Sequence, residues 1–202
     1  MSYKIIVARY NENIEWLNNE MDNCIIYNKG EALGLNNEIM LENFGRESET
    51  YLRYIIDNYD QLPDIIIFTQ ANISDHRGSN DINYLLGIKN DAFVNGKSYP
   101  CYHDETCTYC WWNWNFQEGK YFLEDNYKNN IPILFKDWFN TWVNKDFPNP
   151  IYIFWHGIFS VRKEYILKRT YEYYKQLIGQ VNHHVNPAEG HFFERSWYHI
   201  FH

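Results

Sequence analysis

Asp64-Ile-Ile-Ile-Phe68 is the stretch of sequence that decides the fold. A short, continuous apolar run of this kind is typical of a parallel strand that is buried on both faces. Two similar runs precede it in the chain, Lys4-Ile-Ile-Val-Ala8 and Cys24-Ile-Ile-Tyr27. The first third of the chain is therefore predicted to contain three strands of one buried sheet.

Helical segments separate these three runs. Apolar residues at 14, 17 and 21 follow candidate helix caps at 11–13, and apolar residues at 52, 55, 56 and 59 form a stripe that ends before Pro63. Strands and helices thus alternate, which predicts a mostly parallel sheet flanked by helices and joined by right-handed crossovers. The predicted fold class is α/β.

The rest of the chain has a weaker pattern. Residues from about 80 to 150 are aromatic and rich in cysteine, and they predict loops, short helices and one or two edge strands. Another strand is predicted at Ile151-Tyr-Ile-Phe-Trp155. A following helix is predicted to have Ser160 as its cap. A last helix is predicted after Pro187, from apolar residues at 193, 197, 200 and 201. Because no repeat or linker is visible, we predict a single domain over residues 1–202.

Charge and hydropathy limit the partners and the location. The net charge is −8 and no Lys/Arg-rich run occurs, which argues against duplex nucleic acid because neutralising phosphates needs a basic face. No stretch approaches the length of a membrane span, and the apolar run Ile5–Ala8 is too short for a signal peptide. A cytoplasmic protein is predicted, in the host cytoplasm if it is viral.

Polar residues follow three of the predicted strands. Arg9-Tyr-Asn-Glu12 follows the first, Gln70-Ala-Asn72 with Asp75-His76 follows the third, and His156-Gly157 follows the strand at 151–155. Ligands bind at the carboxyl ends of parallel strands, so these segments are expected to converge on one site. Arg46, at a predicted helix start, could reach an anionic ligand there. The alternatives are that the asparagines only form turns and that Arg46 pairs with Glu47 at the surface.

The C-terminal helix carries a candidate acid–base pair. His191, Glu194 and Tyr198 share one face by their spacing, away from the apolar stripe of Phe193 and Trp197. A carboxylate beside a histidine at a helix start can move protons during catalysis. The alternative is a solvated face whose glutamate is favoured by the helix dipole.

Four potential metal ligands lie within ten residues: Cys101, His103, Cys107 and Cys110. Cys107-x-x-Cys110 is a usual half-site for tetrahedral zinc, and the other two residues could complete it. Such a zinc ion would be structural, because four protein ligands leave no open position. The alternatives are free thiols or a disulfide formed on oxidation.

Several short motifs together resemble a known family. They are Val7-Ala-Arg-Tyr-Asn-Glu12, Tyr27-Asn-Lys-Gly30, Gly45-Arg-Glu47, Leu62-Pro-Asp64 with Gln70, and Gly190-His191 with Glu194. The set resembles the uncharacterised family catalogued as domain of unknown function 3431. The layout of the family is similar to that of GT-A glycosyltransferases, which implies a Rossmann-like fold and transfer of a sugar from a nucleotide sugar to an unknown acceptor.

The resemblance also implies roles for the candidate residues. The donor would be held by Arg9, Tyr10, Asn11, Glu12, Arg46, Gln70, Asn72, Asp75 and His76. The acid/base or acceptor-orienting group would be Glu194 or Glu189, with His191 beside Glu194. These roles follow from the analogy with GT-A enzymes, and a shared fold does not by itself determine function.

One departure from the GT-A pattern keeps alternatives open. The sequence has no Asp-x-Asp, the motif that commonly holds a divalent metal such as Mn²⁺ or Mg²⁺ in those enzymes. Either the metal is held differently, or transfer needs no metal, or the domain binds without catalysing. The alternatives to a transferase are a non-catalytic carbohydrate- or nucleotide-binding module and a structural, virion-associated protein stabilised by zinc.

Overall fold

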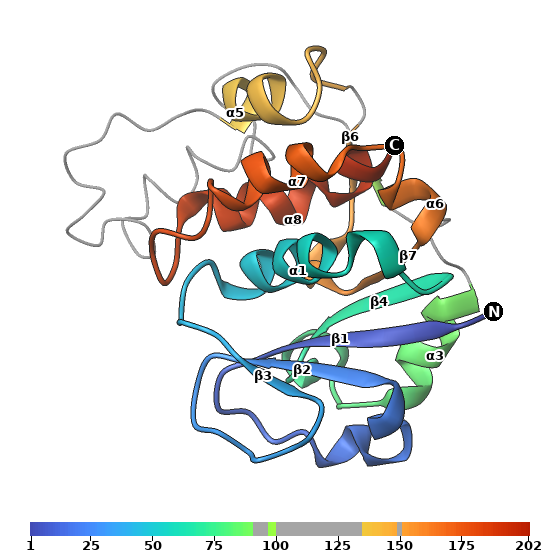
Figure 1. Ribbon diagram of the computed structural model, residues 1–202. Helices are drawn as coiled ribbons and strands as arrows, with labels where there is room; N and C mark the ends of the chain where they lie inside the picture. The colour runs from blue at the N-terminus through green and yellow to red at the C-terminus, as the bar shows by residue number, and fades with distance from the viewer. Residues whose placement is uncertain (91–96, 100–134, 149–150) are drawn as a thin grey trace.

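The computed structural model describes residues 1–90, 97–99, 135–148 and 151–202, and a five-stranded sheet lies at its centre (Figure 1). The strand order is β3-β2-β1-β4-β7. The strands are β1 (Tyr3–Arg9), β2 (Cys24–Asn28), β3 (Glu38–Met40), β4 (Ile65–Gln70) and β7 (Phe159–Arg162). The three apolar runs of the sequence form β1, β2 and β4.

The sheet is mostly parallel, as predicted. β1 pairs in parallel with β2 and with β4, and β2 pairs in parallel with β3. β7 is the exception, because it runs antiparallel to β4 with Ser160 opposite Ile67. The prediction that Ser160 caps a helix is therefore wrong. Phe159 and Val161 join the core under α1 and α8, whereas the Ser160 hydroxyl between them donates to the Ile88 carbonyl at 2.5 Å, as expected for alternate residues of a strand.

Helices cover both faces of the sheet (Figure 1). The helices α1 (Arg46–Asp57), α7 (Tyr171–Ile178) and α8 (Ala188–Phe201) pack on one face, over side chains such as Ile6 and Phe68. The 3-10 helix η1 (Glu15–Asn23) and α3 (Ile82–Asn90) pack on the other face, over Ile5 and Val7. Consecutive residues of β1 thus enter opposite cores, which explains why its apolar run is continuous.

Many aromatic residues of the described ranges pack in the core between α1, α8 and the sheet. Trp197 is fully buried, with its ring centroid 5.9 Å from that of Tyr51 and 5.6 Å from that of Phe159. A second layer comes from α5 (Phe135–Trp142), whose Trp138 lies 5.0 Å from Phe193 of α8. α8 is therefore covered on two sides.

The remaining elements are short. They are η2 (Tyr59–Gln61), α2 (Ser74–Arg77), β5 (Lys97–Tyr99), β6 (Ile151–Ile153), η3 (Trp155–Gly157) and α6 (Lys163–Ile166). The predicted strand at 151–155 exists as β6, but it pairs antiparallel with β5 in a separate two-stranded sheet. Within the described ranges, no helix has both the length and the apolar character needed to span a membrane.

Candidate functional site

A cleft of about 500 Å³ opens at the carboxyl ends of β1 and β4. This volume lies within the range of small-molecule sites. β2 and β3 lie in turn on one side of β1, and β4 lies on the other side of β1, so the strand order reverses there. Open sheets bind ligands at such a reversal. The cleft is lined by Ala8, Arg9, Tyr10, Glu12, Lys29, Asn43, Arg46, Glu47, Gln70, Val185 and Asn186.

Arg9, the last residue of β1, ties together the loops that form one wall of the cleft. Its Nη1 donates to Asn28 Oδ1 at 2.8 Å and to the Glu31 carbonyl at 2.9 Å, and its Nε donates to the Glu12 carbonyl at 2.9 Å. The side chain is buried. Arg9 lines the cleft as predicted, but these bonds show that it also stabilises the wall itself.

The loop after β1 has one internal hydrogen bond, one bond to the loop after β2, and one exposed side chain at the cleft. Asn11 Oδ1 accepts a hydrogen bond from the Glu31 N–H at 2.9 Å, and Glu12 Oε2 accepts one from the Tyr10 N–H at 2.7 Å. Asn11 therefore links the loop after β1 to the loop after β2, and it lies outside the cleft lining. The Tyr10 side chain is half exposed and borders the cleft.

Arg46 places an accessible cation at the start of α1. Its side chain is 52% exposed, and its nearest partners are Asn186 Oδ1 at 3.3 Å and Glu47 Oε2 at 3.9 Å. Its carbonyl accepts a hydrogen bond from the buried ammonium of Lys29 at 2.6 Å. Burial lowers the pKa of Lys29, and the carboxylate of Glu49, 3.0 Å away, opposes this shift. Arg46 is thus the more available of these two cations.

Glu47 also lines the cleft, and the sequence analysis did not identify it as a functional residue. Its side chain is 16% exposed, and burial raises the pKa of its carboxyl, while the charge of Arg46 opposes the shift. In sequence it is the second residue of an amphipathic helix, where acidic residues are common because of the helix dipole. The burial of the Glu47 side chain depends on the strands and on α8, so the local sequence pattern did not reveal it.

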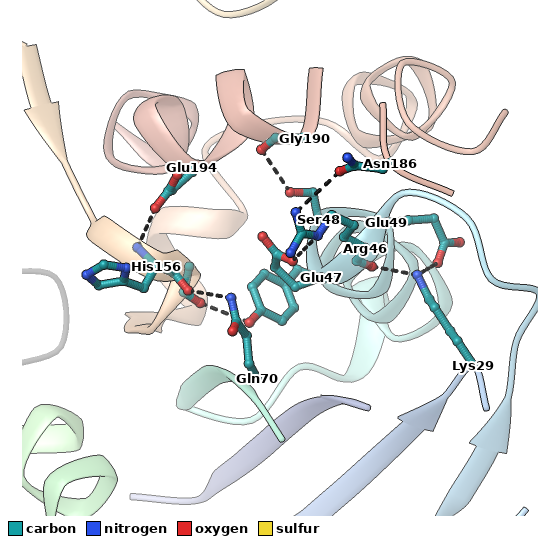
Figure 2. A network of polar contacts seen from close by, with 12 residues as sticks. Lys29, Arg46, Glu47, Ser48, Glu49, Gln70, His156, Asn186, Gly190 and Glu194 are labelled. Carbon is teal, nitrogen blue, oxygen red and sulfur yellow. Dashed lines mark hydrogen bonds and ion pairs between the residues drawn. The ribbon is translucent and has the colours of Figure 1, made fainter. Parts of the chain in front are cut away.

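The turn at His156 and Gly157 lies outside the cleft lining but contacts two of its residues, Gln70 and Glu47. Gln70 Nε2 donates to the His156 carbonyl at 2.9 Å, the His156 N–H donates to Glu194 Oε1 at 2.6 Å, and Figure 2 shows Glu194 and Gln70 approaching this turn from different elements. His156 has a φ of 68°, and Arg46 has a φ of 49°. Within the described residues these are the only non-glycine positions with positive φ. Such strained backbone is concentrated at functional sites.

The segment after β4 only partly joins the site. Gln70 lines the cleft, and the His76 ring stacks on the His156 ring with centroids 3.8 Å apart. Asn72 instead stabilises the turn before α2, because its Oδ1 accepts hydrogen bonds from the Ser74 N–H at 3.1 Å and the Ser74 hydroxyl at 2.7 Å. Asp75 lies exposed on α2 and outside the cleft lining.

The candidate acid–base residues of α8 are more constrained than the sequence suggested. Both carboxylate oxygens of Glu194 are engaged, one with the His156 N–H at 2.6 Å and the other with Arg195 Nη1 at 3.1 Å. Burial lowers the pKa of His191 to about 3, so its ring is neutral at physiological pH. Glu189 lies in the first turn of the helix. The face that carries His191, Glu194 and Tyr198 is partly exposed, so it is neither fully solvated nor fully buried.

The proposed zinc ligands lie outside the described residues. These ligands are Cys101, His103, Cys107 and Cys110. Among the residues that the structure does describe, no three His, Cys, Asp or Glu side chains are grouped closely enough to hold a metal ion. The zinc site therefore stays a prediction from sequence.

We expect the full-length protein, purified under reducing conditions, to contain about one zinc ion per chain, as one tetrahedral site requires. Elemental analysis would measure this directly. The variant Cys107→Ser should lose the metal because it removes one of four ligands, whereas Cys24→Ser, at a buried position in β2, should keep it. Metal-free protein with four titratable thiols would contradict the prediction.

Comparison with protein families agrees with the motif analysis. A family model described as "Protein of unknown function (DUF3431)" matches residues 5–202. The chain belongs to the DUF3431 family. Searches of curated proteins and of solved structures gave no match. The cleft of this DUF3431 protein must therefore be interpreted from its own chemistry.

Proposed function

We propose that this protein transfers a glycosyl group from a nucleotide sugar to an acceptor, and that the cleft binds the donor. The observation that carries the proposal is the position of the Arg46 guanidinium, which lies at the start of α1 and lines a cleft at the carboxyl ends of β1 and β4. The order β3-β2-β1-β4 corresponds to the first four strands of Rossmann-like sheets, which supports a Rossmann-like, GT-A-like assignment.

The chemistry of the cleft suits a diphosphate. Arg46 offers a planar fork of donors that matches phosphate oxygens, and its side chain is largely accessible. The positive end of the α1 dipole adds to this attraction. Since the whole chain carries a net charge of −8, binding of an anion depends on such local groups rather than on a general basic surface.

The size and the rim of the cleft suit a nucleoside. A volume of about 500 Å³ accommodates a ligand of this class. Tyr10 borders the cleft with a half-exposed ring, on which a base could stack. Asn186 and Glu12, at the same rim, supply hydrogen-bonding groups.

We expect nucleoside diphosphates at millimolar concentration to raise the Tm, because a ligand that binds only the folded state stabilises it by mass action. Arg46→Gln should abolish most of this rise. The variant should fold normally, since the contact that Lys29 makes with residue 46 is to the backbone carbonyl. Thermal unfolding with a panel of uridine, guanosine, cytidine and thymidine diphosphates measures both effects.

Lys175→Gln is the matched control, because Lys175 is 50% exposed on α7 and lies outside the cleft lining. Its response to ligand should equal that of the wild type. If no diphosphate changes the Tm of the wild-type protein, nucleotide binding is excluded. An equal rise in Tm for Arg46→Gln would show that the phosphates bind elsewhere.

A second candidate function is binding without catalysis. The observation that favours it is the state of the two residues first assigned to proton transfer. Glu194 has both oxygens in hydrogen bonds, and His191 has a pKa of about 3. A catalytic protein therefore needs a different carboxylate, and a binding module needs none. Measuring donor hydrolysis or sugar transfer together with binding separates these two functions.

A further inference from the structure

The cleft contains one carboxylate that is both partly buried and loosely paired. The shortest ion-pair distance of Glu47 in the described structure is 3.9 Å, to Arg46 Nε, which is beyond hydrogen-bond length. Glu194, by contrast, accepts hydrogen bonds at 2.6 and 3.1 Å. Glu47 also lines the cleft, whereas Glu194 does not.

We propose that Glu47 is the proton-transferring carboxylate of the cleft and that Glu194 is a positioning residue, which acts through the His156–Gly157 turn. This inference rests on the proposed function and names the catalytic group of the same site.

The turn at 156–157 is held against Glu47 by three side chains. Glu194 accepts from the His156 N–H, Gln70 donates to the His156 carbonyl, and the Tyr51 hydroxyl donates to the Gly157 carbonyl at 2.9 Å. These contacts maintain the left-handed conformation of His156 (φ 68°), which a non-glycine residue rarely adopts. The strained turn is therefore stabilised from α8, β4 and α1 at once (Figure 2).

Gly157 brings this turn into contact with the side chain of Glu47. A Cβ atom at position 157 would lie 3.3 Å from Glu47 Cγ and 3.8 Å from Glu47 Oε1, and Gly157 itself has a φ of 64°. The turn thus covers Glu47 on one side, and the cleft leaves it open on another. Partial exclusion of water from a carboxylate makes it a stronger base, since burial disfavours the charged form.

The titratable groups around Glu47 come from three parts of the chain. Arg46 and Tyr51 belong to α1, Lys29 follows β2, and Glu194 belongs to α8. Burial and the charge of Glu194 raise the pKa of Glu47, whereas Arg46 and Lys29 lower it, and the net direction is upward. Arg9 and Glu12 are the other charged groups of the cleft lining. A base works best when its pKa lies near the working pH, so the direction of this shift suits the role.

In the proposed step, one bond to the anomeric carbon of the donor sugar forms and another breaks. The oxygen of the acceptor hydroxyl forms a bond with the anomeric carbon of the donor sugar, and its proton moves to a carboxylate oxygen of Glu47. The bond between the anomeric carbon and the diphosphate oxygen breaks, and the nucleoside diphosphate leaves with the electron pair. Arg46 lies next to Glu47 in the chain and would stabilise the departing charge.

The test is Glu47→Gln, which keeps the size of the side chain and removes its basicity. Transfer to the acceptor, or slow donor hydrolysis, should fall by at least about 100-fold, the usual scale for loss of a general base. The rise in Tm caused by nucleoside diphosphates should persist. The Tm without ligand should equal or exceed that of the wild type, because the substitution removes a partly buried charge.

Glu42→Gln is the matched control, since Glu42 is exposed in the loop before α1 and lies outside the cleft lining. It should keep wild-type activity. Glu194→Gln supplies a readout of positioning: it removes a negative charge that raises the pKa of Glu47, so the acid limb of the pH–rate profile should move to lower pH. A purely structural Glu194 would change the rate and leave this limb in place.

The possible outcomes separate the two proposals. If Glu47→Gln binds diphosphates and transfers as fast as the wild type, the role of Glu47 is overturned and the proposed function stands. If the wild type binds no diphosphate, the proposed function fails. The pH–rate profile of the wild-type protein tests the role of Glu47 even if Glu47→Gln does not fold. An acid limb at or below the ordinary glutamate pKa of about 4.3 would overturn that role.

Discussion

Replacement of Arg195 by methionine should lower the free energy of unfolding by about 3 kcal/mol, the lower end of the range for breaking a buried ion pair. The Arg195 side chain is 4% exposed, and its Nη1 donates to Glu194 Oε2 at 3.1 Å and to the His191 carbonyl at 3.0 Å. Burial lowers its pKa to about 10, so the guanidinium stays charged at neutral pH. The variant would leave Glu194 with an uncompensated charge in a poorly solvated place.

Urea denaturation monitored by tryptophan fluorescence would measure this loss. The double variant Glu194→Gln/Arg195→Met is the control, and it should regain much of the stability because no unpaired charge remains. Equal losses in the single and double variants would mean that packing of the arginine, rather than its charge, matters. A single variant as stable as the wild type would show that the pair contributes nothing.

The variant Gly30→Ala should lose about 3 kcal/mol of unfolding free energy, because the added methyl group overpacks a rigid contact. A Cβ atom at Gly30 would lie 1.7 Å from the carbonyl oxygen of Tyr10 and 2.3 Å from Asn11 Oδ1. The first of these atoms belongs to the backbone, so the loops after β1 and β2 would have to separate. Since both loops line the cleft, the response of the Tm to nucleoside diphosphates should also be lost.

The same substitution at Gly87 gives a matched control with the opposite sign. Gly87 is exposed in α3, and a Cβ atom there would meet no other atom within 4 Å. Gly87→Ala should therefore raise the unfolding free energy by roughly 0.5–1 kcal/mol, as alanine does in a helix interior. If Gly30→Ala were as stable as the wild type in urea denaturation, the close approach of the two loops would be wrong.

The local sequence pattern was sufficient to predict an element whose own residue types and spacing identify it. The buried strands at Ile5–Val7 and Ile65–Phe68 and the apolar stripe of α1 depend on residue type and spacing alone, so they were predicted correctly. The local pattern did not predict β3. Ile39 and Met40 of this edge strand are exposed, so it has no buried face to produce a pattern.

The prediction of the site succeeded at the level of segments and not of every residue. Arg9, Tyr10, Glu12, Arg46 and Gln70 do line one cleft, because parallel strands bring their carboxyl ends to the same edge. Asn11 instead links two loops, and Asn72 stabilises a turn. Sequence could not distinguish these roles, because a side-chain amide bonds a ligand or the nearby backbone with the same groups.

The sequence by itself determined the α/β class, the mostly parallel sheet and the family, because each depends on residue types in local order. Only the tertiary structure decided which carboxylates are engaged. Glu47 belongs to α1 and Glu194 to α8, and their burial, partners and charges come from groups distant in the chain, such as His156 and Lys29. Electrostatic energies depend on distance and solvent exposure in space, and neither quantity is encoded in local spacing.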